Sequence, residues 1–166
     1  MNKTISSPIN SPNHVAETPV SAVQVFLIDE YEPVLWGLAK LIQGEYPRMH
    51  LVGTATTRSA ALTGVIRQKP DVVMLDYGLS NGSTLNFLSQ LAVLGHHRIL
   101  VLIGQEYSPE LVRRLLALGA CGVINKQAPT ELLLHAIACA YKQGHWCELF
   151  TQKNLVNERR HYSRPH

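Results

Sequence analysis

Beyond residue 22 the chain alternates short apolar runs with longer segments in which apolar residues recur every three or four positions. Short, continuous apolar runs are typical of strands buried on both faces, and the longer period is typical of helices that cover a sheet. Five such pairs follow one another, which indicates an α/β domain built on a parallel sheet. The predicted strands are 23–28, 50–55, 71–75, 98–103 and 121–124.

The predicted helices begin and end at residues with known effects on helix boundaries. Pro33 stands in a first turn, where proline is tolerated, and Pro70 ends the second helix because the residue before a proline is pushed out of the helical region. Ser108, Pro109 and Glu110 supply a cap, a first-turn proline and a first-turn acid for the fourth helix. The helices are therefore expected to start near residues 32, 59, 83, 109 and 129.

The last two predicted helices offer surfaces for self-association. The main apolar stripe of the last helix includes Leu133 and Ile137, and further apolar residues lie outside that stripe. Either helix can form a two-fold interface, so we predict a homodimer. The residues concerned are Leu132, Ala136 and Cys139 in the last helix and Arg113 and Arg114 in the helix before it.

The two ends of the chain differ in composition from its middle. Residues 1–22 are rich in Ser, Pro, Asn and Thr and show no apolar period, so burial cannot offset the entropy lost on ordering them. We predict a flexible N-terminal arm over 1–22, a folded domain over 23–144 and a basic tail or linker over 145–166. A short basic tail is more often a solvated linker than a binding element, so we do not expect this chain itself to bind nucleic acid.

Composition and cysteine usage predict a cytoplasmic protein. The formal net charge is only +3, and the 46% hydrophobic and 16% charged content is ordinary for a soluble globular protein. The three cysteines lack CxxC spacing and fall in or beside apolar segments, which favours reduced packing residues over zinc ligands or disulfides. No stretch is long and apolar enough to span a bilayer, and the amino terminus lacks the apolar segment of a signal peptide, so no membrane contact is expected.

Ionisable residues follow three of the predicted strands. Asp29 and Glu30 come after the first strand, Asp76 after the third and Lys126 after the fifth. The carboxyl ends of parallel strands meet at one edge of a sheet, so these side chains are expected to share one crevice. Each of them alone is more commonly a solvated or capping residue, and it is their joint placement that favours a site.

These residue types suit phosphoryl chemistry assisted by a divalent metal. Asp76 can act as a nucleophile toward phosphorus and form an acyl phosphate if a metal neutralises charge on the incoming group. Asp29 and Glu30 can hold Mg²⁺, which prefers a few carboxylates, waters and phosphate oxygens, with the backbone carbonyl of Gly78 as a further ligand. Lys126 can pair with Asp76 or with a phosphoryl oxygen.

The segments around these residues resemble the receiver domain of bacterial two-component response regulators, over about residues 23–143. They are LIDE, PDVVMLDYGLSNGSTL and ELVRRLLALGACGVINKQAPTELLLHAI, the last of which looks most like the NarL/FixJ subfamily, whose receivers normally precede a helix-turn-helix domain. The resemblance implies a doubly wound, flavodoxin/CheY-like sheet of order 2-1-3-4-5 with five helices. It also implies that a histidine kinase phosphorylates Asp76, that Asp29 and Glu30 bind Mg²⁺, and that Lys126 contacts the phosphoryl group.

The chain departs from the family pattern at four positions. Ile103 stands where the family has a Ser or Thr that binds a phosphoryl oxygen, and Val123 replaces the rotating Tyr or Phe. In the family these two positions carry phosphorylation to the surface of the domain, so both ends of the switch are altered here. Ser80 and Thr84 replace a proline and a glycine in the loop after Asp76, which changes the stiffness of the loop more than its chemistry.

Two functions from different classes remain open. One is a phospho-accepting receiver in two-component signal transduction that regulates transcription, and the alternative is a degenerate receiver that acts as a phosphorylation-independent dimerisation or docking module. Aspartate-dependent phosphatases place a second acid two residues after the nucleophile, where this chain has Gly78, so we do not expect an enzyme. The sequence also contains no P-loop, GxGxxG or GxSxG motif that would support nucleotide or hydrolase chemistry. The residues after Gly144 are too few for a helix-turn-helix, so we expect any transcriptional output in another part of a longer protein or in a partner.

Overall fold

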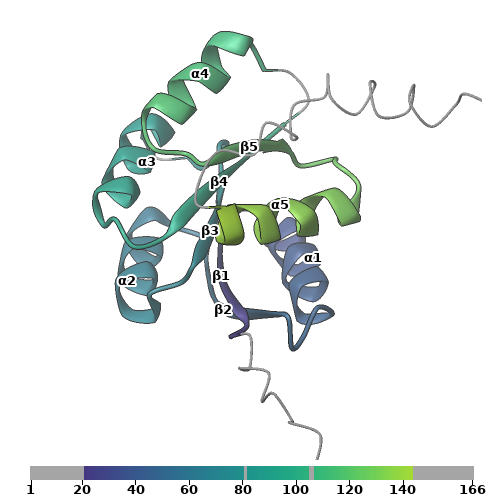
Figure 1. Ribbon diagram of the computed structural model, residues 1–166. Helices are drawn as coiled ribbons and strands as arrows, with labels where there is room; N and C mark the ends of the chain where they lie inside the picture. The colour runs from purple at the N-terminus through teal and green to yellow at the C-terminus, as the bar shows by residue number, and fades with distance from the viewer. Residues whose placement is uncertain (1–20, 81, 105–106, 144–166) are drawn as a thin grey trace, which may run out of the picture.

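The structure is a computed structural model that describes residues 21–80, 82–104 and 107–143. In this part of the chain five parallel strands form one sheet in the order β2-β1-β3-β4-β5, and five helices alternate with the strands (Figure 1). The predicted fold class and strand order are confirmed. The elements are β1 (Val23–Ile28), α1 (Glu32–Gln43), β2 (Met49–Ala55), α2 (Arg58–Gln68), β3 (Val72–Asp76), α3 (Thr84–Val93), β4 (Arg98–Ile103), α4 (Pro109–Ala117), β5 (Gly122–Asn125) and α5 (Thr130–Gln143).

Helices cover both faces of the sheet, which is why its central strands are apolar along their length. α1 and α5 lie on one face, and α2, α3 and α4 lie on the other (Figure 1). Along β4, Leu100 and Leu102 pack on the α1 and α5 side, whereas Ile99, Val101 and Ile103 pack on the opposite side. Successive side chains of a strand point to opposite faces, so the domain has one apolar core on each face of the sheet.

Three helices begin at polar caps. Thr57, Ser83 and Ser108 precede α2, α3 and α4, and each side chain accepts a hydrogen bond from the backbone N–H three residues further on. These bonds satisfy amide groups that have no partner within their helix. The cap at Thr57 places the start of α2 one residue before the predicted position.

β3 extends one residue further than predicted and ends at Asp76. Asp76 pairs with Leu102 of β4, and the N–H of the next residue, Tyr77, donates to the Leu102 carbonyl at 2.8 Å. The backbone of Asp76 is therefore held by the sheet itself, at its carboxyl edge.

Two of the three residues outside the main stripe of α5 are buried in the core and cannot form an interface. Ala136 is 0% exposed and Cys139 is 7% exposed, and Leu132 packs against the same core. α5 packs against β3, β4 and β5 and so buries a wider face than a single stripe. The prediction that these three residues form a two-fold interface is therefore wrong for Ala136 and Cys139. Cys121 is half-buried, and both cysteines pack in the core as predicted.

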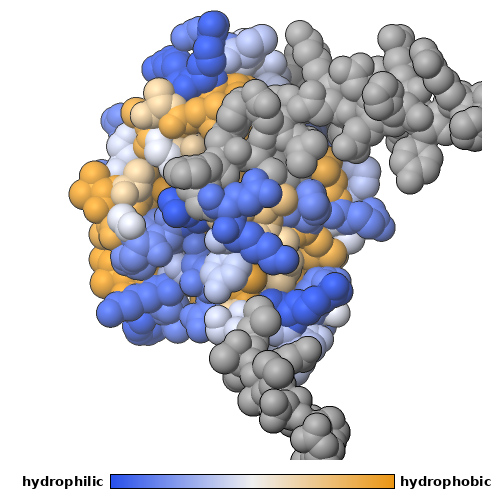
Figure 2. Space-filling model, in the orientation of Figure 1, coloured by the Kyte–Doolittle hydropathy of each residue, from blue (hydrophilic) through white to orange (hydrophobic). Residues whose placement is uncertain are grey.

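Exposed apolar side chains are scattered over several elements. Ile66 of α2 and Val93 of α3 are 54% and 86% exposed, and Figure 2 shows apolar surface at the edge of the molecule over these two helices. Tyr31, Trp36 and Tyr46 are exposed as well. Scattered apolar residues are ordinary on a protein surface, so they do not define an interface by themselves.

The predicted N-terminal arm and C-terminal tail fall outside the described residues, apart from Ser21 and Ala22. Cys147, in the tail, is outside them too. In the parts of the chain that the structure describes, no helix combines the length and the apolar character needed to cross a membrane.

The packing of α2 on the sheet depends on two glycines. The ring of Phe26 in β1 is 2% exposed and fills the space beside Gly53 of β2 and Gly64 of α2. A Cβ on Gly53 would stand 2.5 Å from the Phe26 ring, and a Cβ on Gly64 would also stand closer to the ring than real Cβ atoms do. Both positions therefore favour a residue without a side chain.

We predict that Gly64→Ala lowers the free energy of unfolding by about 1–3 kcal/mol, because the new methyl group overpacks the core against Phe26. Gly37→Ala in α1 is the matched control, because a Cβ there meets nothing within 4 Å. Alanine has the higher helix propensity, so this control should be stabilised by up to about 1 kcal/mol. Urea denaturation should give opposite signs for the two variants, and stabilisation of both would contradict the tight contact.

Candidate functional site

The carboxyl ends of β1, β3 and β5 bring three charged side chains into contact. Asp29 follows β1, Asp76 is the last residue of β3, and Lys126 follows β5. The ammonium nitrogen of Lys126 lies 2.7 Å from Asp29 Oδ2 and 2.9 Å from Asp76 Oδ1. The structure thus brings together three of the four ionisable residues that the sequence singled out.

The two carboxylates are buried, and the lysine is only partly so. Asp29 and Asp76 are 1% and 5% exposed, and the Lys126 side chain is 23% exposed. Burial by itself lowers the pKa of Lys126, but hydrogen bonds to Asp29 and Asp76 and the attraction of their charges outweigh it, so this pKa is raised above its usual value. Lys126 is therefore a firmly protonated cation between two acids.

Backbone amides also donate hydrogen bonds to the two carboxylates. The N–H of Tyr31 donates to Asp29 Oδ1 at 2.9 Å, and the N–H of Gly78 donates to Asp76 Oδ1 at 3.0 Å. A Cβ on Gly78 would stand 3.3 Å from Asp76 Oδ2, which is closer than side chains usually approach. A glycine at this position therefore lets the loop after β3 fold closely against the Asp76 carboxylate.

The Glu30 carboxylate bonds to the loop after β3. Its Oε2 accepts hydrogen bonds from the Ser80 hydroxyl and from the Ser80 N–H, the latter at 3.0 Å. These two bonds, the hydroxyl first, lower the pKa of Glu30 below its usual value. Neighbouring side chains at the end of a strand diverge, so Asp29 faces Lys126 while Glu30 faces the loop after β3.

The charged cluster contains two carboxylates and no third acid. Such a pair of carboxylates suits Mg²⁺. Among the described residues, no three His, Cys, Asp or Glu side chains form a group that could hold a metal ion. Magnesium is nevertheless bound in proteins through one or two carboxylates, with waters and substrate oxygens as the other ligands. Asp29 and Asp76, which both face one cation, are such a pair.

No signal in the sequence pointed to Arg58, the first residue of α2. Its guanidinium donates hydrogen bonds to four backbone carbonyls of the loop after β3, which lie 21 to 25 residues further along the chain. No motif marks such a residue, because its partners are backbone atoms that only the packing of α2 beside α3 brings within reach.

The two altered switch positions are apolar and buried. Ile103 is the last residue of β4 and is 2% exposed, and Val123 in β5 is 6% exposed. Both belong to the apolar core on the side of α2, α3 and α4. Neither side chain can form a hydrogen bond, so the end of β4 offers no hydroxyl to the charged cluster.

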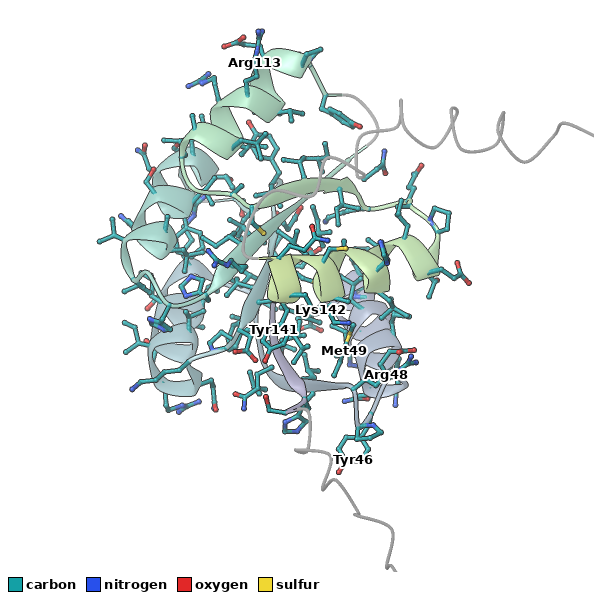
Figure 3. All side chains as sticks on the ribbon, viewed as in Figure 1. Tyr46, Arg48, Met49, Arg113, Tyr141 and Lys142 are labelled. Atoms are coloured by element: carbon teal, nitrogen blue, oxygen red, sulfur yellow. The ribbon has the colours of Figure 1, made fainter. Side chains whose placement is uncertain are left out.

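A cavity opens at the opposite edge of the sheet. It measures about 570 Å³ and lies between the amino ends of β1 and β2 and the end of α5, where Arg48, Met49, Tyr141 and Lys142 line it (Figure 3). The charged cluster stands at the carboxyl edge, so this cavity is not part of it. The cluster, with its buried carboxylates, is the better candidate for phosphoryl chemistry.

Comparison with protein families assigns the chain to one of them. The family model described as the response regulator receiver domain matches residues 25–138, which include all three members of the charged cluster. The chain belongs to the family of response regulator receiver domains. The resemblance seen in the sequence is thereby confirmed.

The chain also matches curated relatives that are longer than it is. The oxygen regulatory protein NreC of Staphylococcus aureus is 28% identical over 137 residues, which are 82% of this chain and 63% of NreC. The chain therefore spans less than two thirds of the length of that relative.

Solved structures of receiver domains share the fold. The signal receiver domain of the response regulator NarL from Mycobacterium tuberculosis matches with a TM-score of 0.67 and 22% identity, over 74% of this chain and 98% of that one. A LuxR-family two-component response regulator from Aurantimonas sp. SI85-9A1 matches with a TM-score of 0.71 and 19% identity, over 87% of this chain and 100% of that one. At these identities the two likenesses show a shared fold.

We predict that Lys126→Met lowers the free energy of unfolding by about 3 kcal/mol at neutral pH, because it leaves two buried carboxylates without a counter-charge. Added Mg²⁺ should reduce this loss, since a divalent cation can take the place of the ammonium. Lys40→Met on the exposed face of α1 is the matched control and should change stability little. Chemical denaturation with and without Mg²⁺ measures both effects. A loss that Mg²⁺ leaves unchanged would argue against a cation site shared by Asp29 and Asp76.

A half-buried histidine at the amino edge of the sheet makes stability depend on pH. Both ring nitrogens of His97 are shielded from solvent, and burial, followed by the charge of neighbouring His96, lowers the pKa of His97 from 6.5 to about 4. Between these two values the unfolded chain takes up a proton that the folded protein does not. The free energy of unfolding should therefore fall as the pH decreases from about 6.5 to about 4.

We expect His97 to account for about 1 kcal/mol of this fall, because its ring is only partly buried and solvent screens its charge. His97→Phe should remove this part of the pH dependence, whereas His50→Asn, at an exposed histidine of β2, should retain it. Urea denaturation at a series of pH values provides the comparison. An unchanged pH profile in His97→Phe would contradict the assignment.

Proposed function

We propose that the chain is a phospho-accepting receiver in which Asp76 takes a phosphoryl group from a histidine kinase. Receiver domains of two-component systems are phosphorylated by histidine kinases, and the chain belongs to that family. The observation that carries the proposal is the contact of Lys126 with both Asp29 and Asp76. Phosphoryl acceptance needs a carboxylate nucleophile beside a fixed positive charge, and this cluster supplies both. The cluster favours phosphorylation over a docking module that works without it.

The proposed step is a displacement at phosphorus. The hydrogen bonds that Asp76 accepts from Lys126 and from the N–H of Gly78 both reach Oδ1, so we assign Oδ2 as the attacking oxygen. A bond forms between Oδ2 and phosphorus as the bond between phosphorus and the imidazole nitrogen of the kinase phosphohistidine breaks, and the nitrogen keeps the electron pair. The Lys126 ammonium then donates a hydrogen bond to a phosphoryl oxygen, which stabilises the acyl phosphate.

We further propose that Asp29, Glu30, Asp76 and the backbone carbonyl of Gly78 form the Mg²⁺ site. When bound, the ion neutralises charge on the phosphoryl oxygens, so that two anions can meet. Asp29 and Asp76 are the acids that already share a cation, and Glu30, which follows Asp29 in the chain, is bonded to Ser80 of the loop after β3. The backbone carbonyl of Gly78 belongs to the residue whose amide already bonds Asp76.

The output that we propose is the regulation of transcription from the cytoplasm, through a longer protein or a partner. The chain spans 63% of the length of NreC, whose name describes an oxygen regulatory protein. This chain itself would bind no nucleic acid and would act as a homodimer. Ile103 cannot bind a phosphoryl oxygen and Val123 cannot perform the rotation of the family's Tyr or Phe, so we propose that phosphorylation acts by changing self-association.

We predict that acetyl phosphate and Mg²⁺ add the mass of one phosphoryl group to the wild-type protein and none to Asp76→Asn. Asp29→Asn should slow the labelling roughly tenfold or more, because it removes one acid of the metal site. Asp71→Asn is the matched control, because Asp71 directly precedes β3, the strand that ends at Asp76. The asparagine keeps an oxygen that can accept the hydrogen bond from the Gln24 N–H. Mass spectrometry of the intact protein measures the label.

If Asp76→Asn were labelled to the wild-type level, Asp76 would not be the phosphoryl acceptor. Light scattering of the labelled and unlabelled protein tests the output. We expect the labelled protein to self-associate at lower concentration, and a strictly monomeric species in both states would contradict the homodimer.

A further inference from the structure

The loop between β3 and α3 is held by polar side chains at the two positions where the family has a proline and a glycine. Ser80 binds Glu30 through its hydroxyl and its N–H. The Thr84 hydroxyl donates to the carbonyl of Tyr77 at 2.8 Å and so closes the loop on itself. The loop is therefore fixed by hydrogen bonds across it, not by a residue with a restricted backbone.

Arg58 binds this loop at four points. Its Nη2 donates to the carbonyls of Gly82 at 2.7 Å and Leu79 at 2.8 Å, its Nη1 to that of Ser83 at 2.8 Å and its Nε to that of Ser80 at 3.2 Å. A guanidinium presents five donors in a rigid plane, which suits a ring of converging carbonyls.

The guanidinium of Arg58 also contacts an aromatic ring. Its carbon Cζ lies 5.2 Å from the centre of the Phe87 ring in α3, within the range of a cation–π contact. Arg58 is the first residue of α2 and directly follows the cap residue Thr57, so the start of the helix fixes the backbone of Arg58. Contacts outside the loop therefore help to hold the Arg58 side chain in the position from which it bonds the loop.

Contacts lead from Arg58 to both sides of the charged cluster. On one side, the Ser80 carbonyl bonds Arg58 while the Ser80 N–H and hydroxyl bond Glu30. On the other side, Arg58 bonds the carbonyl of Leu79, and Leu79 directly follows Gly78, whose N–H bonds Asp76. A change at Arg58 therefore reaches the acceptor and the exposed acid through one loop.

We propose that Arg58 is a positioning residue that fixes the loop after β3 and so sets the affinity of the acceptor site for Mg²⁺. The inference rests on the proposed function, since it assigns Arg58 a role in the same metal site. Arg58 would touch neither the ion nor the phosphoryl group. It acts through the positions of Ser80, Glu30 and Gly78.

The experiment compares Arg58→Met and Arg58→Lys with Arg67→Met, a matched control in the last turn of the same helix. Amide hydrogen exchange of residues 78–84 is measured without metal. The binding of Mn²⁺, as a paramagnetic probe, and the Mg²⁺ concentration that gives half-maximal labelling by acetyl phosphate are measured well below the melting temperature of each variant.

We expect Arg58→Met to speed exchange in the loop and to raise the half-maximal Mg²⁺ concentration roughly tenfold or more, the usual effect of losing a residue that orients metal ligands. Saturating Mg²⁺ should restore most of the labelling rate. Arg58→Lys keeps the charge but not the planar fork, so it should lie between wild type and Arg58→Met. Arg67→Met should behave as wild type.

A merely structural Arg58 would lower thermal stability and leave Mn²⁺ binding and the Mg²⁺ requirement unchanged, and that result overturns the proposal. If Arg58→Met does not fold, the same comparison is made with Arg58→Lys. Failure of the wild type to accept phosphoryl would overturn the proposed function instead, and Mn²⁺ binding with hydrogen exchange would still decide the role of Arg58.

Discussion

One ammonium group in contact with two buried carboxylates is the interaction on which the rest of the site depends. Asp29 and Asp76 leave different strands and are almost fully buried, and a buried carboxylate without a partner is strongly unfavourable. Lys126 supplies the opposite charge from a third strand. The strand order makes this possible, because β1 and β3 are neighbours and β5 follows β4 in the same parallel sheet. The contact therefore ties the fold to the chemistry, since the residues that satisfy the buried charges are those that would accept and neutralise a phosphoryl group.

The surroundings of this cluster divide into a polar half and an apolar half. On the side of β1 and α2, the loop after β3 is braced by Glu30 through Ser80 and by Arg58 through its carbonyls. On the side of β4 and β5, Ile103 and Val123 fill the apolar core. The polar half would support the proposed chemistry at Asp76, whereas the apolar half could not respond to it by forming new hydrogen bonds. In the proposed function, acceptance of the phosphoryl group is therefore separate from its transmission to the surface.

Local sequence signals predicted the elements well and the width of their buried faces poorly. The strands at 23–28 and 98–103 have the predicted bounds, because each mostly apolar run contrasts clearly with the residues that follow it. β3 runs one residue further, to Asp76, because pairing with β4 determines where a strand ends and a charged residue can still take part. The interface proposed for Ala136 and Cys139 fails for a related reason. Helical periodicity locates the centre of a buried stripe, whereas the strands beneath the helix decide how far burial extends to either side.

The sequence by itself determined the order of strands and helices, the strand ends that carry Asp29, Asp76 and Lys126, and the apolar character of Ile103 and Val123. These follow from apolar patterning and residue type, which are local properties of the chain. Only the tertiary structure decided that one ammonium bonds both acids, that Glu30 turns to Ser80, and that Arg58 holds the loop after β3. Each of these depends on distances between residues far apart in the chain, and several involve backbone carbonyls or amides, which every residue possesses and no pattern distinguishes.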